Sequence, residues 1–395
     1  MDKLIYMDNA ATTSTAPEVV SAMLPFFTEY YGNPSSVYNF AQKSKMAIED
    51  AREIIADSIG AAKSNEIYFT GGGSESDNWA LKSAAFGLRN KGNHIITTKI
   101  EHHAILNTCA YLEKNGFEIT YLDVDSEGFV SLEDVENAIT EKTILISVMF
   151  ANNEIGTIEP VCEIGEIAHK HGILFHTDAV QAMCHVPINV TEMNIDLLSA
   201  SAHKFHGPKG VGFMYMKNSA KLEPFIHGGA QERARRAGTS NVPGIVGMGQ
   251  AVKLALITLD KDTHTIINMR NYIVDRILGE IPDVTFDGPC IDANAVSAGS
   301  PAGSLKRLPS NMHFCFKDVS GDSLLIMLDM NGICASSGSA CAAGSIDPSH
   351  VLLAIGRSKG ETKGALRLSI DKDLTKEDAD YAIDALKAAV ARLRR

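Results

Sequence analysis

Lys204 and Asp178 are the residues whose types and settings most directly indicate chemistry. Lys204 lies in residues 201–210 (SAHKFHGPKG), after a strand-like stretch and before a Gly-Pro turn. Asp178 ends an apolar, strand-like run at residues 173–178. A lysine amine can form a Schiff base with pyridoxal phosphate, and a carboxylate at the ring nitrogen lets the ring withdraw electrons. Together the two residues predict a pyridoxal phosphate site.

Each residue alone has a simpler interpretation. Most lysines are surface charges, and an aspartate after a strand often caps the next helix. Ser201 and His203 before Lys204, and the Gly-Pro turn after it, favour the functional interpretation. Gln181 follows Asp178 by one helical turn, so its side chain could reach the phenolic oxygen of the cofactor ring.

Residues 70–78 (TGGGSESDN) follow a predicted strand and lead into a predicted helix. Glycines leave backbone N–H groups accessible, and Ser74 is a good N-cap residue, so the turn resembles an anion site at a helix N-terminus. A glycine-rich turn is often only a turn. Beside a pyridoxal lysine we interpret it as a phosphate cradle.

Residues 101–103 (EHH) follow another predicted strand. One imidazole could stack on the cofactor ring and move protons, because histidine titrates near neutral pH. A structural histidine is the simpler alternative. Two adjacent histidines also raise the possibility of a metal, but the sequence offers no third ligand at convincing spacing, so we predict no metal site.

Cys341 lies in residues 335–345 (ASSGSACAAGS), a run too small and polar for packed core. An accessible thiol there suits a nucleophile that carries sulfur. The chain has seven cysteines, and we expect Cys109, Cys162, Cys184, Cys315 and Cys334 to be structural. Arg367 lies in an alternating strand-like segment; it could hold an amino acid's α-carboxylate or form a surface salt bridge.

The composition describes a globular protein of 395 residues with 45% apolar and 21% charged residues. The formal charge of −12 argues against nucleic acid or an anionic membrane as the main partner. No apolar run approaches the ~20 residues of a membrane span. With no C-x-x-C pair and no signal-like start, we expect a reducing, cytoplasmic location.

Seven short β-rich runs alternate with helical stretches in the first two-thirds of the chain. They are residues 67–69, 95–97, 119–122, 144–150, 173–176, 197–199 and 211–216. This alternation predicts an α/β fold with a mostly parallel, seven-stranded sheet covered by helices on both faces. Residues 131–134 resemble a capping box, and residues 161–172 read as a helix closed by glycine.

The pattern changes after about residue 255. A helical stretch to about residue 280 is followed by residues 288–309, which are rich in Gly, Ala, Ser and Pro and read as a loop. A smaller α+β unit then ends in a helix capped near Thr375, with one apolar stripe through Ile383, Leu386 and Val390.

Further motifs are residues 6–13 (YMDNAATT), 32–36 (GNPSS), 152–156 (NNEIG) and 237–239 (AGT). With those above, the chain resembles the NifS-like cysteine desulfurases of the class-V aminotransferase-like group, which are fold-type I pyridoxal phosphate enzymes. Residues 336–341 (SSGSAC) resemble the long-loop desulfurases, whose sulfur goes to partner proteins. The resemblance implies a large cofactor domain at 15–255, and a small domain of 1–14 and 256–395 that carries the cysteine loop.

The resemblance also implies roles for individual residues. Lys204 would bind the cofactor covalently, Asp178 would pair with its ring nitrogen, and His102 would stack on the ring as acid–base. Asn153 and Gln181 would contact the phenolic oxygen, and Asn153 and Arg367 would hold the substrate carboxylate. The phosphate would be bound by Gly73, Ser74, Ser201 and His203, with Thr239 from the second subunit of a homodimer.

The implied activity is conversion of L-cysteine to L-alanine, with the sulfur left as a persulfide on Cys341. An acceptor protein would take that sulfur, for example an iron–sulfur scaffold or a tRNA-thiolation protein. An aminotransferase, a selenocysteine lyase and a non-catalytic sulfur scaffold on the same fold remain alternatives. A nicotinamide enzyme is remote, because no dinucleotide fingerprint is present.

The sequence departs from the family pattern in several places. Ser74 stands where threonine is usual, and Tyr38, Ala41 and Gln42 replace the usual His-x-x-Gly-Arg positions, which could alter the rim of the site. The 288–309 segment is longer than usual, and residues 342–344 read Ala-Ala-Gly. We expect these differences to bear on the partner more than on the chemistry.

Overall fold

The central sheet of the computed structural model contains the seven expected strands. The structure describes residues 4–220, 222–291, 305–337 and 348–395. The strand order is β2-β8-β7-β6-β5-β3-β4. The bounds are β2 Ile67–Thr70, β3 His94–Thr98, β4 Glu118–Leu122, β5 Thr143–Ser147, β6 Leu174–Asp178, β7 Leu197–Ser201 and β8 Gly212–Met216. The predicted α/β sheet is therefore confirmed, although the run at 144–150 leaves the sheet after Ser147.

Most neighbouring strands run parallel, and β8 is the exception. It is antiparallel to both β2 and β7, whereas the pairs from β7 to β4 are parallel. Two successive antiparallel steps bring β2 back to the direction of β7. The carboxyl ends of β2, β3, β5, β6 and β7 therefore meet at one edge, where ligands bind in sheets of this kind.

Consecutive residues of the strands pack into different hydrophobic clusters on the two faces. Ile96, Ile146 and Leu198 join one cluster, while their neighbours join the other. This alternation follows from the two-residue period of a strand. Helices α3 (Asn39–Ser58), α7 (Val161–Lys170) and the first part of α9 cover the first face; α4 (Gly73–Gly87) and α5 (His103–Glu113) cover the second.

Local capping explains where several helices begin. Ser131 accepts a hydrogen bond from Asp134 N at the start of α6 (Leu132–Asn137), as the sequence predicts. Thr375 likewise accepts from Asp378 N and opens α12 (Lys376–Leu393). The predicted stripe of α12 is buried in the C-terminal cluster.

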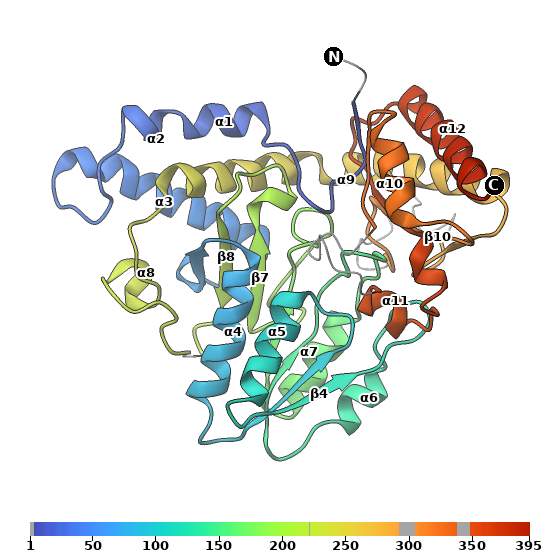
Figure 1. The fold of residues 1–395 in the computed structure, drawn as a ribbon. Coiled ribbons are helices and arrows are strands. Elements are labelled where there is room, and N and C mark those ends of the chain that lie inside the picture. The colour runs from blue at the N-terminus through green and yellow to red at the C-terminus, as the bar shows by residue number, and fades with distance from the viewer. Residues whose placement is uncertain (1–3, 221, 292–304, 338–347) are drawn as a thin grey trace.

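Helix α9 (Val242–Glu280) begins earlier than the expected start near residue 255. Asn241 Oδ1 accepts from Gly244 N, and a proline in the first turn favours the start there. Figure 1 shows α9 running along one edge of the molecule from the larger unit to the smaller one. By length and composition α9 could also cross a membrane, contrary to the sequence expectation, but its apolar residues pack into the clusters of both units.

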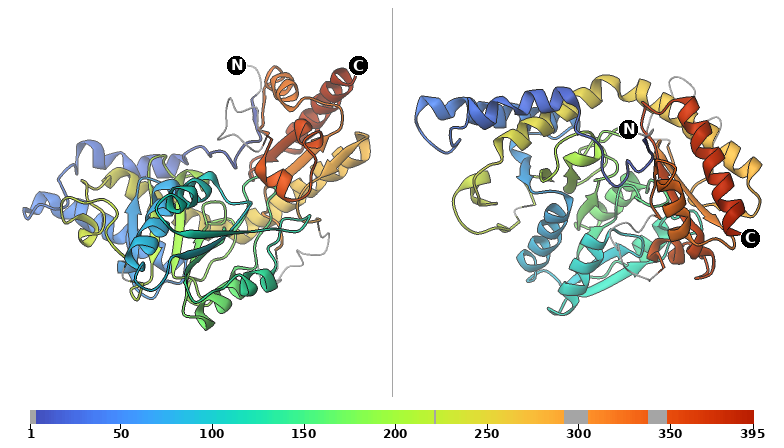
Figure 2. Two further views of the ribbon diagram at one scale, coloured as in Figure 1. Left: turned by 60° about the horizontal axis from the view of Figure 1, so that its bottom comes forward. Right: turned by 45° about the horizontal axis from the view of Figure 1, so that its top comes forward.

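The smaller unit is built on β10 (Asn311–Phe316), which pairs antiparallel with β9 (Val284–Phe286) and β12 (Ala365–Ser369). At the N-terminal end, β1 (Ile5–Tyr6) pairs in parallel with β11 (Ile333–Cys334) and lies beside the C-terminal elements (Figure 2). The remaining elements are α1 Pro17–Met23, α2 Pro25–Thr28, α8 Gln231–Ala234, α10 Gly321–Asp329, α11 His350–Ala354, and the 3₁₀ turns Ser64–Glu66, Ala202–Lys204 and Glu361–Gly364.

The predicted domain boundary between residues 255 and 256 falls inside α9. The helix is continuous there. Its buried apolar side chains from Val242 to Val252 belong to the cluster of the large unit. Those that join the cluster of the smaller unit are Ile266, Ile273, Val274 and Ile277. The division into two domains stays a prediction.

Candidate active site

Lys204 ends a short 3₁₀ turn that directly follows β7. Its Nζ donates to the carbonyl oxygens of Ala10 and Ala11, at 2.5 and 2.8 Å. Gln181 Nε2 donates to the same Ala10 oxygen at 3.0 Å. The N-terminal segment therefore brings Lys204 and Gln181 together, and their membership of one cofactor site stays a prediction.

Asp178 is the last residue of β6 and is buried. Its Oδ1 accepts from Val180 N at 2.9 Å. Burial raises the pKa of Asp178, while the nearby His102 and Lys204 act to lower it. A cationic ring nitrogen placed beside this carboxylate would favour its ionised form.

Asp77 is a second buried carboxyl group beside Asp178, and the sequence analysis missed it. Ligand atoms of Asp77, His102 and Asp178 all lie within 4.8 Å of one another. Burial, and then the charge of Asp178, raise the pKa of Asp77 well above its usual range. Asp77 follows Gly73 by four residues and precedes Ala80 by three, so the helical period of the buried face of α4 was the available signal.

His102 is the N-cap residue of α5, directly after the turn that follows β3. Its Nδ1 accepts from Ala104 N at 3.1 Å, so the neutral ring carries its proton on Nε2. The adjacent Glu101 is buried and accepts from Met149 N and Thr98 Oγ1. These contacts hold the imidazole at the edge of the sheet where β6 ends with Asp178.

A hollow of about 470 Å³ lies at the N-terminus of α4. Gly72 has φ 147°, which favours glycine, and a Cβ on Gly73 would come within 2.5 Å of Val180 Cγ2. The other lining residues include Thr12, Ser74, Ser201, His203 and Lys209. Backbone N–H groups at the start of a helix, with the positive charge of Lys209 on the wall of the same hollow, suit a phosphate.

The predicted capping role of Ser74 is wrong. The helix begins at Gly73, its N-cap residue is Gly72, and no side chain caps it. Ser74 is exposed in the first turn and lines the hollow. With Gly72 as the N-cap, the helix begins one residue before Ser74, so Ser74 belongs to the first turn rather than to the cap.

His203 lies between the hollow and the N-terminal segment. Its Nδ1 is 3.1 Å from Thr12 Oγ1. Burial, with Lys204 and Lys209 as smaller causes, lowers the pKa of His203 to about 4. The imidazole is therefore neutral at pH 7 and can offer a phosphate a hydrogen bond rather than a charge.

Arg367 is a buried residue of β12, so the surface salt bridge considered from the sequence is excluded. Its guanidinium donates to Asp8 Oδ1 at 2.8 Å and to the carbonyl oxygen of Asn153 at 3.1 Å. Arg367, Asn153 and the N-terminal segment that holds Lys204 therefore meet in one place. Asp8 was not predicted individually, although it lies in the motif at residues 6–13.

Cys341 lies outside the described residues, but both flanks of its segment are described. Ser336 exchanges two backbone hydrogen bonds with Arg367. On the other side, Ser349 Oγ donates to Glu154 Oε2 at 2.5 Å, and His350 Nε2 lies 2.9 Å from the carbonyl oxygen of Glu101. The chain therefore enters and leaves the Cys341 segment beside predicted site residues.

Other predicted residues lie in varied surroundings. Cys109 and Cys315 are buried, Cys162, Cys184 and Cys334 are half-buried, and burial raises the pKa of each of these five thiols. Thr239 is exposed and does not line the hollow described above. Tyr38 is exposed, whereas Ala41 is fully buried against Gly32. The alanine that replaces the family's usual residue at position 41 therefore affects packing and not the rim of the site.

Comparison with known proteins places the chain in a family. The family model described as aminotransferase class-V matches residues 5–382. The chain belongs to the aminotransferase class-V family. A member described as cysteine desulfurase IscS from Clostridium botulinum is 54% identical, over 100% of this chain and 96% of its own length.

Solved structures similar to this chain agree with that assignment. A structure named NifS-like protein has a TM-score of 0.90 and 36% identity, and the match covers 99% of this chain and 100% of that one. A structure of SspA in complex with cysteine has a TM-score of 0.78 and 38% identity, over 93% of this chain and 99% of that one. The fold-type I architecture expected from the sequence is thereby confirmed.

Proposed function

We propose that this protein is a pyridoxal phosphate-dependent cysteine desulfurase. It converts L-cysteine to L-alanine and leaves the sulfur as a persulfide on Cys341, from which an acceptor protein takes it. The observation that best supports this proposal is the pair of backbone hydrogen bonds between Ser336 and Arg367. They attach the chain just before the Cys341 segment to the residue best suited to hold the substrate's carboxylate.

The residues at the sheet edge fit pyridoxal phosphate. A lysine amine, a buried carboxylate and a glycine cradle are the three groups that the cofactor requires. A Cβ on Gly73 would collide with Val180, so the cradle requires glycine there. We assign Lys204 to the covalent link, Asp178 to the ring nitrogen, and His102, Asn153 and Gln181 to the ring and its phenolic oxygen. Gly73, Ser74, Ser201 and His203 would hold the phosphate.

When bound, the cofactor withdraws electrons from the substrate's α-carbon and so weakens the bonds that must break. Arg367 and Asn153 hold the α-carboxylate. The Lys204 amine, displaced by substrate, takes the α-proton. His102 Nε2–H acts as the proton donor. The carboxyl groups of Asp77 and Asp178 lie side by side in the buried site, and two adjacent buried negative charges would repel each other. Asp77 therefore retains a proton while Asp178 carries the charge.

Sulfur transfer needs no further reactant. The Cys341 thiolate attacks the sulfur of the substrate; an S–S bond forms and the substrate's C–S bond breaks. The electron pair of that bond stays with the carbon, which takes up protons and leaves as alanine. Cysteine plus one protein thiol gives alanine plus one protein persulfide, so atoms and electrons balance.

A homodimer would complete the phosphate site through Thr239 of the second subunit. Exposed apolar side chains gather on α1, α2, α3 and their connection: Leu24, Phe27, Tyr31, Val37 and Phe40, with Val37 95% exposed. A group of this kind is typical of a protein–protein interface. The net charge and cysteine usage favour a cytoplasmic enzyme, with an iron–sulfur scaffold or a tRNA-thiolation protein as acceptor.

A selenocysteine lyase or an aminotransferase would use the same lysine and carboxylates. These alternatives do not require a thiol at residue 341. Comparing alanine output from cysteine with selenide output from selenocysteine, for wild type and Cys341→Ala, separates them. The proposed function requires that the variant loses the reaction with cysteine.

A single-turnover experiment tests the proposal on the unaltered enzyme. Holoenzyme is mixed with L-cysteine without reductant, and alanine and protein-bound persulfide are counted. We expect one persulfide for each alanine, mapped to the peptide of Cys341. Alanine formed without persulfide, or release of pyruvate and ammonia instead, would contradict the assignment.

A further inference from the structure

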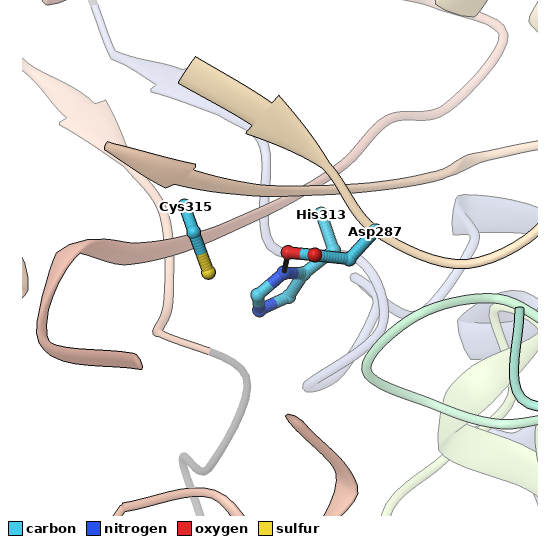
Figure 3. A group of neighbouring side chains, drawn as sticks. All are labelled: Asp287, His313 and Cys315. Atoms are coloured by element: carbon cyan, nitrogen blue, oxygen red, sulfur yellow. Dashed lines mark hydrogen bonds and ion pairs between the residues drawn. The ribbon is translucent and has the colours of Figure 1, made fainter. Parts of the chain in front are cut away.

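Asp287, His313 and Cys315 form a cluster of three different donor groups in the smaller unit (Figure 3). The three side chains are at most 4% exposed. One ligand atom from each lies within 4.8 Å of the other two. None of the three has a role in the proposed sulfur transfer, and the sequence analysis predicted no metal site.

The strands fix the positions of these side chains. His313 and Cys315 are two residues apart on β10 and therefore project to the same face. Asp287 follows β9, the neighbour of β10, and its backbone N donates to His313 O at 3.0 Å. A site held by two paired strands varies little in geometry.

We propose that Asp287, His313 and Cys315 bind a divalent transition-metal ion of the zinc class. A thiolate, an imidazole and a carboxylate are the donor groups that Zn²⁺ takes in proteins. Three protein ligands leave one position of a tetrahedron, which a water molecule or a small exogenous ligand would take. The ligands would be His313 Nδ1, Asp287 Oδ2 and Cys315 Sγ.

Net charge does not oppose metal binding here. In the structure His313 Nδ1 lies 2.8 Å from Asp287 Oδ2, as an ion pair when the imidazole is protonated. On binding a metal ion the thiol would lose its proton to solvent. The carboxylate and the thiolate would then offset the two charges of the cation, which matters for a buried group.

The surrounding contacts orient Asp287 for this role. Arg357 Nε donates to Asp287 Oδ1 at 2.6 Å and leaves Oδ2 directed at His313. Hydrogen bonds to the second oxygen of a metal-binding carboxylate are the usual outer contacts of such sites. Arg357 itself follows α11, so the metal site would also fix that helix end against β9 and β10.

Asp77, His102 and Asp178 are the other group of this kind among the described residues. They belong to the cofactor site, and they contain no thiol. A metal bound there would have no sulfur ligand, whereas a metal at Cys315 would have one. The number of sulfur ligands therefore identifies the site.

The test uses pyridoxal phosphate-loaded protein carrying Cys341→Ser, so that the sulfur-transfer thiol cannot contribute. The protein is freed of metal with a chelator, kept reduced with a phosphine, and dialysed against Zn²⁺ alone. We expect one tightly bound zinc per chain, with one sulfur and two or more nitrogen or oxygen ligands by zinc-edge X-ray absorption. Bound zinc should also raise the melting temperature.

Variants then identify the ligands. Cys315→Ser, His313→Gln and Asp287→Asn should weaken zinc binding at least about 10- to 100-fold, the range known for loss of outer contacts alone. Cys290→Ser and Cys334→Ser are matched controls, since one thiol is exposed and the other half-buried outside the cluster, and both should keep the zinc. Circular dichroism and cofactor content check that each variant is folded.

Three results would overturn the proposal. They are the absence of tight zinc binding, a zinc spectrum with no sulfur ligand, and unchanged zinc affinity in Cys315→Ser. The spectrum of the protein without cluster substitutions decides the matter even if a cluster variant fails to fold. None of these results bears on the desulfurase assignment, which is tested by alanine and persulfide.

Discussion

Arg367 and Ser336 exchange both of their backbone hydrogen bonds, at 2.6 Å from Arg367 N to Ser336 O and 3.2 Å in reverse. Arg367 also donates to Asp8 and Asn153 through its side chain. The same residue thus joins the strand of the smaller unit, the N-terminal segment and the start of the Cys341 segment. A change at Arg367 should affect substrate binding before it affects the cofactor.

Arg367→Lys should raise KM for cysteine about 10- to 100-fold, because a lysine cannot form the two-pronged contact of a guanidinium with a carboxylate. Cofactor content should stay near that of wild type. Steady-state alanine formation measures the effect. Arg276→Lys is the control, since Arg276 pairs with Glu280 and Asp380 on the outer side of the smaller unit. A normal KM in Arg367→Lys would remove Arg367 from the substrate site.

Reduction of the holoenzyme with borohydride should fix the cofactor to Lys204. The reason is that Lys204 Nζ lies at the N-terminal segment beside Gln181, next to the strand that ends in Asp178. Peptide mapping locates the label. Lys209 provides the comparison, because it lines the same hollow: Lys209→Ala should keep the label, and Lys204→Ala should lose it. Label on any other lysine contradicts the assignment.

Glu159 should make the protein less stable as the pH rises. Burial raises the pKa of Glu159 from 4.5 to about 8, so the folded state holds a proton that the unfolded state releases. The resulting stability is complete below about pH 4.5 and is lost as the pH rises through about 8, by up to roughly 5 kcal/mol.

Glu159→Gln keeps an acceptor for Val130 N and removes the titrating group. Relative to wild type, this variant should therefore gain stability between pH 4.5 and 8 in urea unfolding. Glu163→Gln, at an exposed position on α7, serves as the control for loss of one carboxyl group. A constant difference between Glu159→Gln and wild type across this pH range would contradict the prediction.

Phe27→Glu combined with Leu24→Glu should convert a dimer into monomers of low activity. Both side chains are more than half exposed and lie in the apolar group on α1 to α3. Sedimentation velocity measures the change. Met330→Glu is the control, because Met330 is 81% exposed on the smaller unit, away from that group. A fully active monomer would contradict the shared phosphate site.

The sequence predicted the sheet well, because each strand is a short apolar run between turn residues, such as residues 67–69 before Gly71. It also singled out Lys204, Asp178 and Arg367, whose types are demanded by the proposed chemistry, and their roles stay predictions. It placed the start of α9 too late, because Val242 to Leu254 contains three glycines that weaken a helical pattern. Two of them, Gly247 and Gly249, pack against Met23 and Ala51.

Contacts between distant segments were beyond the sequence. Asp77 lies 101 residues before Asp178, and only the packing of α4 on the sheet brings the two carboxyl groups together. Asp287 and Cys315 likewise meet through the pairing of β9 with β10. No local pattern records such a pairing, since it is decided by which strands become neighbours.

The central claim is that Cys341 receives the sulfur, and the most direct test is the turnover of Cys341→Ser with L-cysteine. The account predicts that alanine and sulfide formation are abolished, while the variant binds the cofactor as wild type does, because Lys204 and the glycine cradle are unchanged. Cys334→Ser should retain activity as the control. Near-normal turnover by Cys341→Ser would contradict the desulfurase mechanism and favour a lyase or aminotransferase.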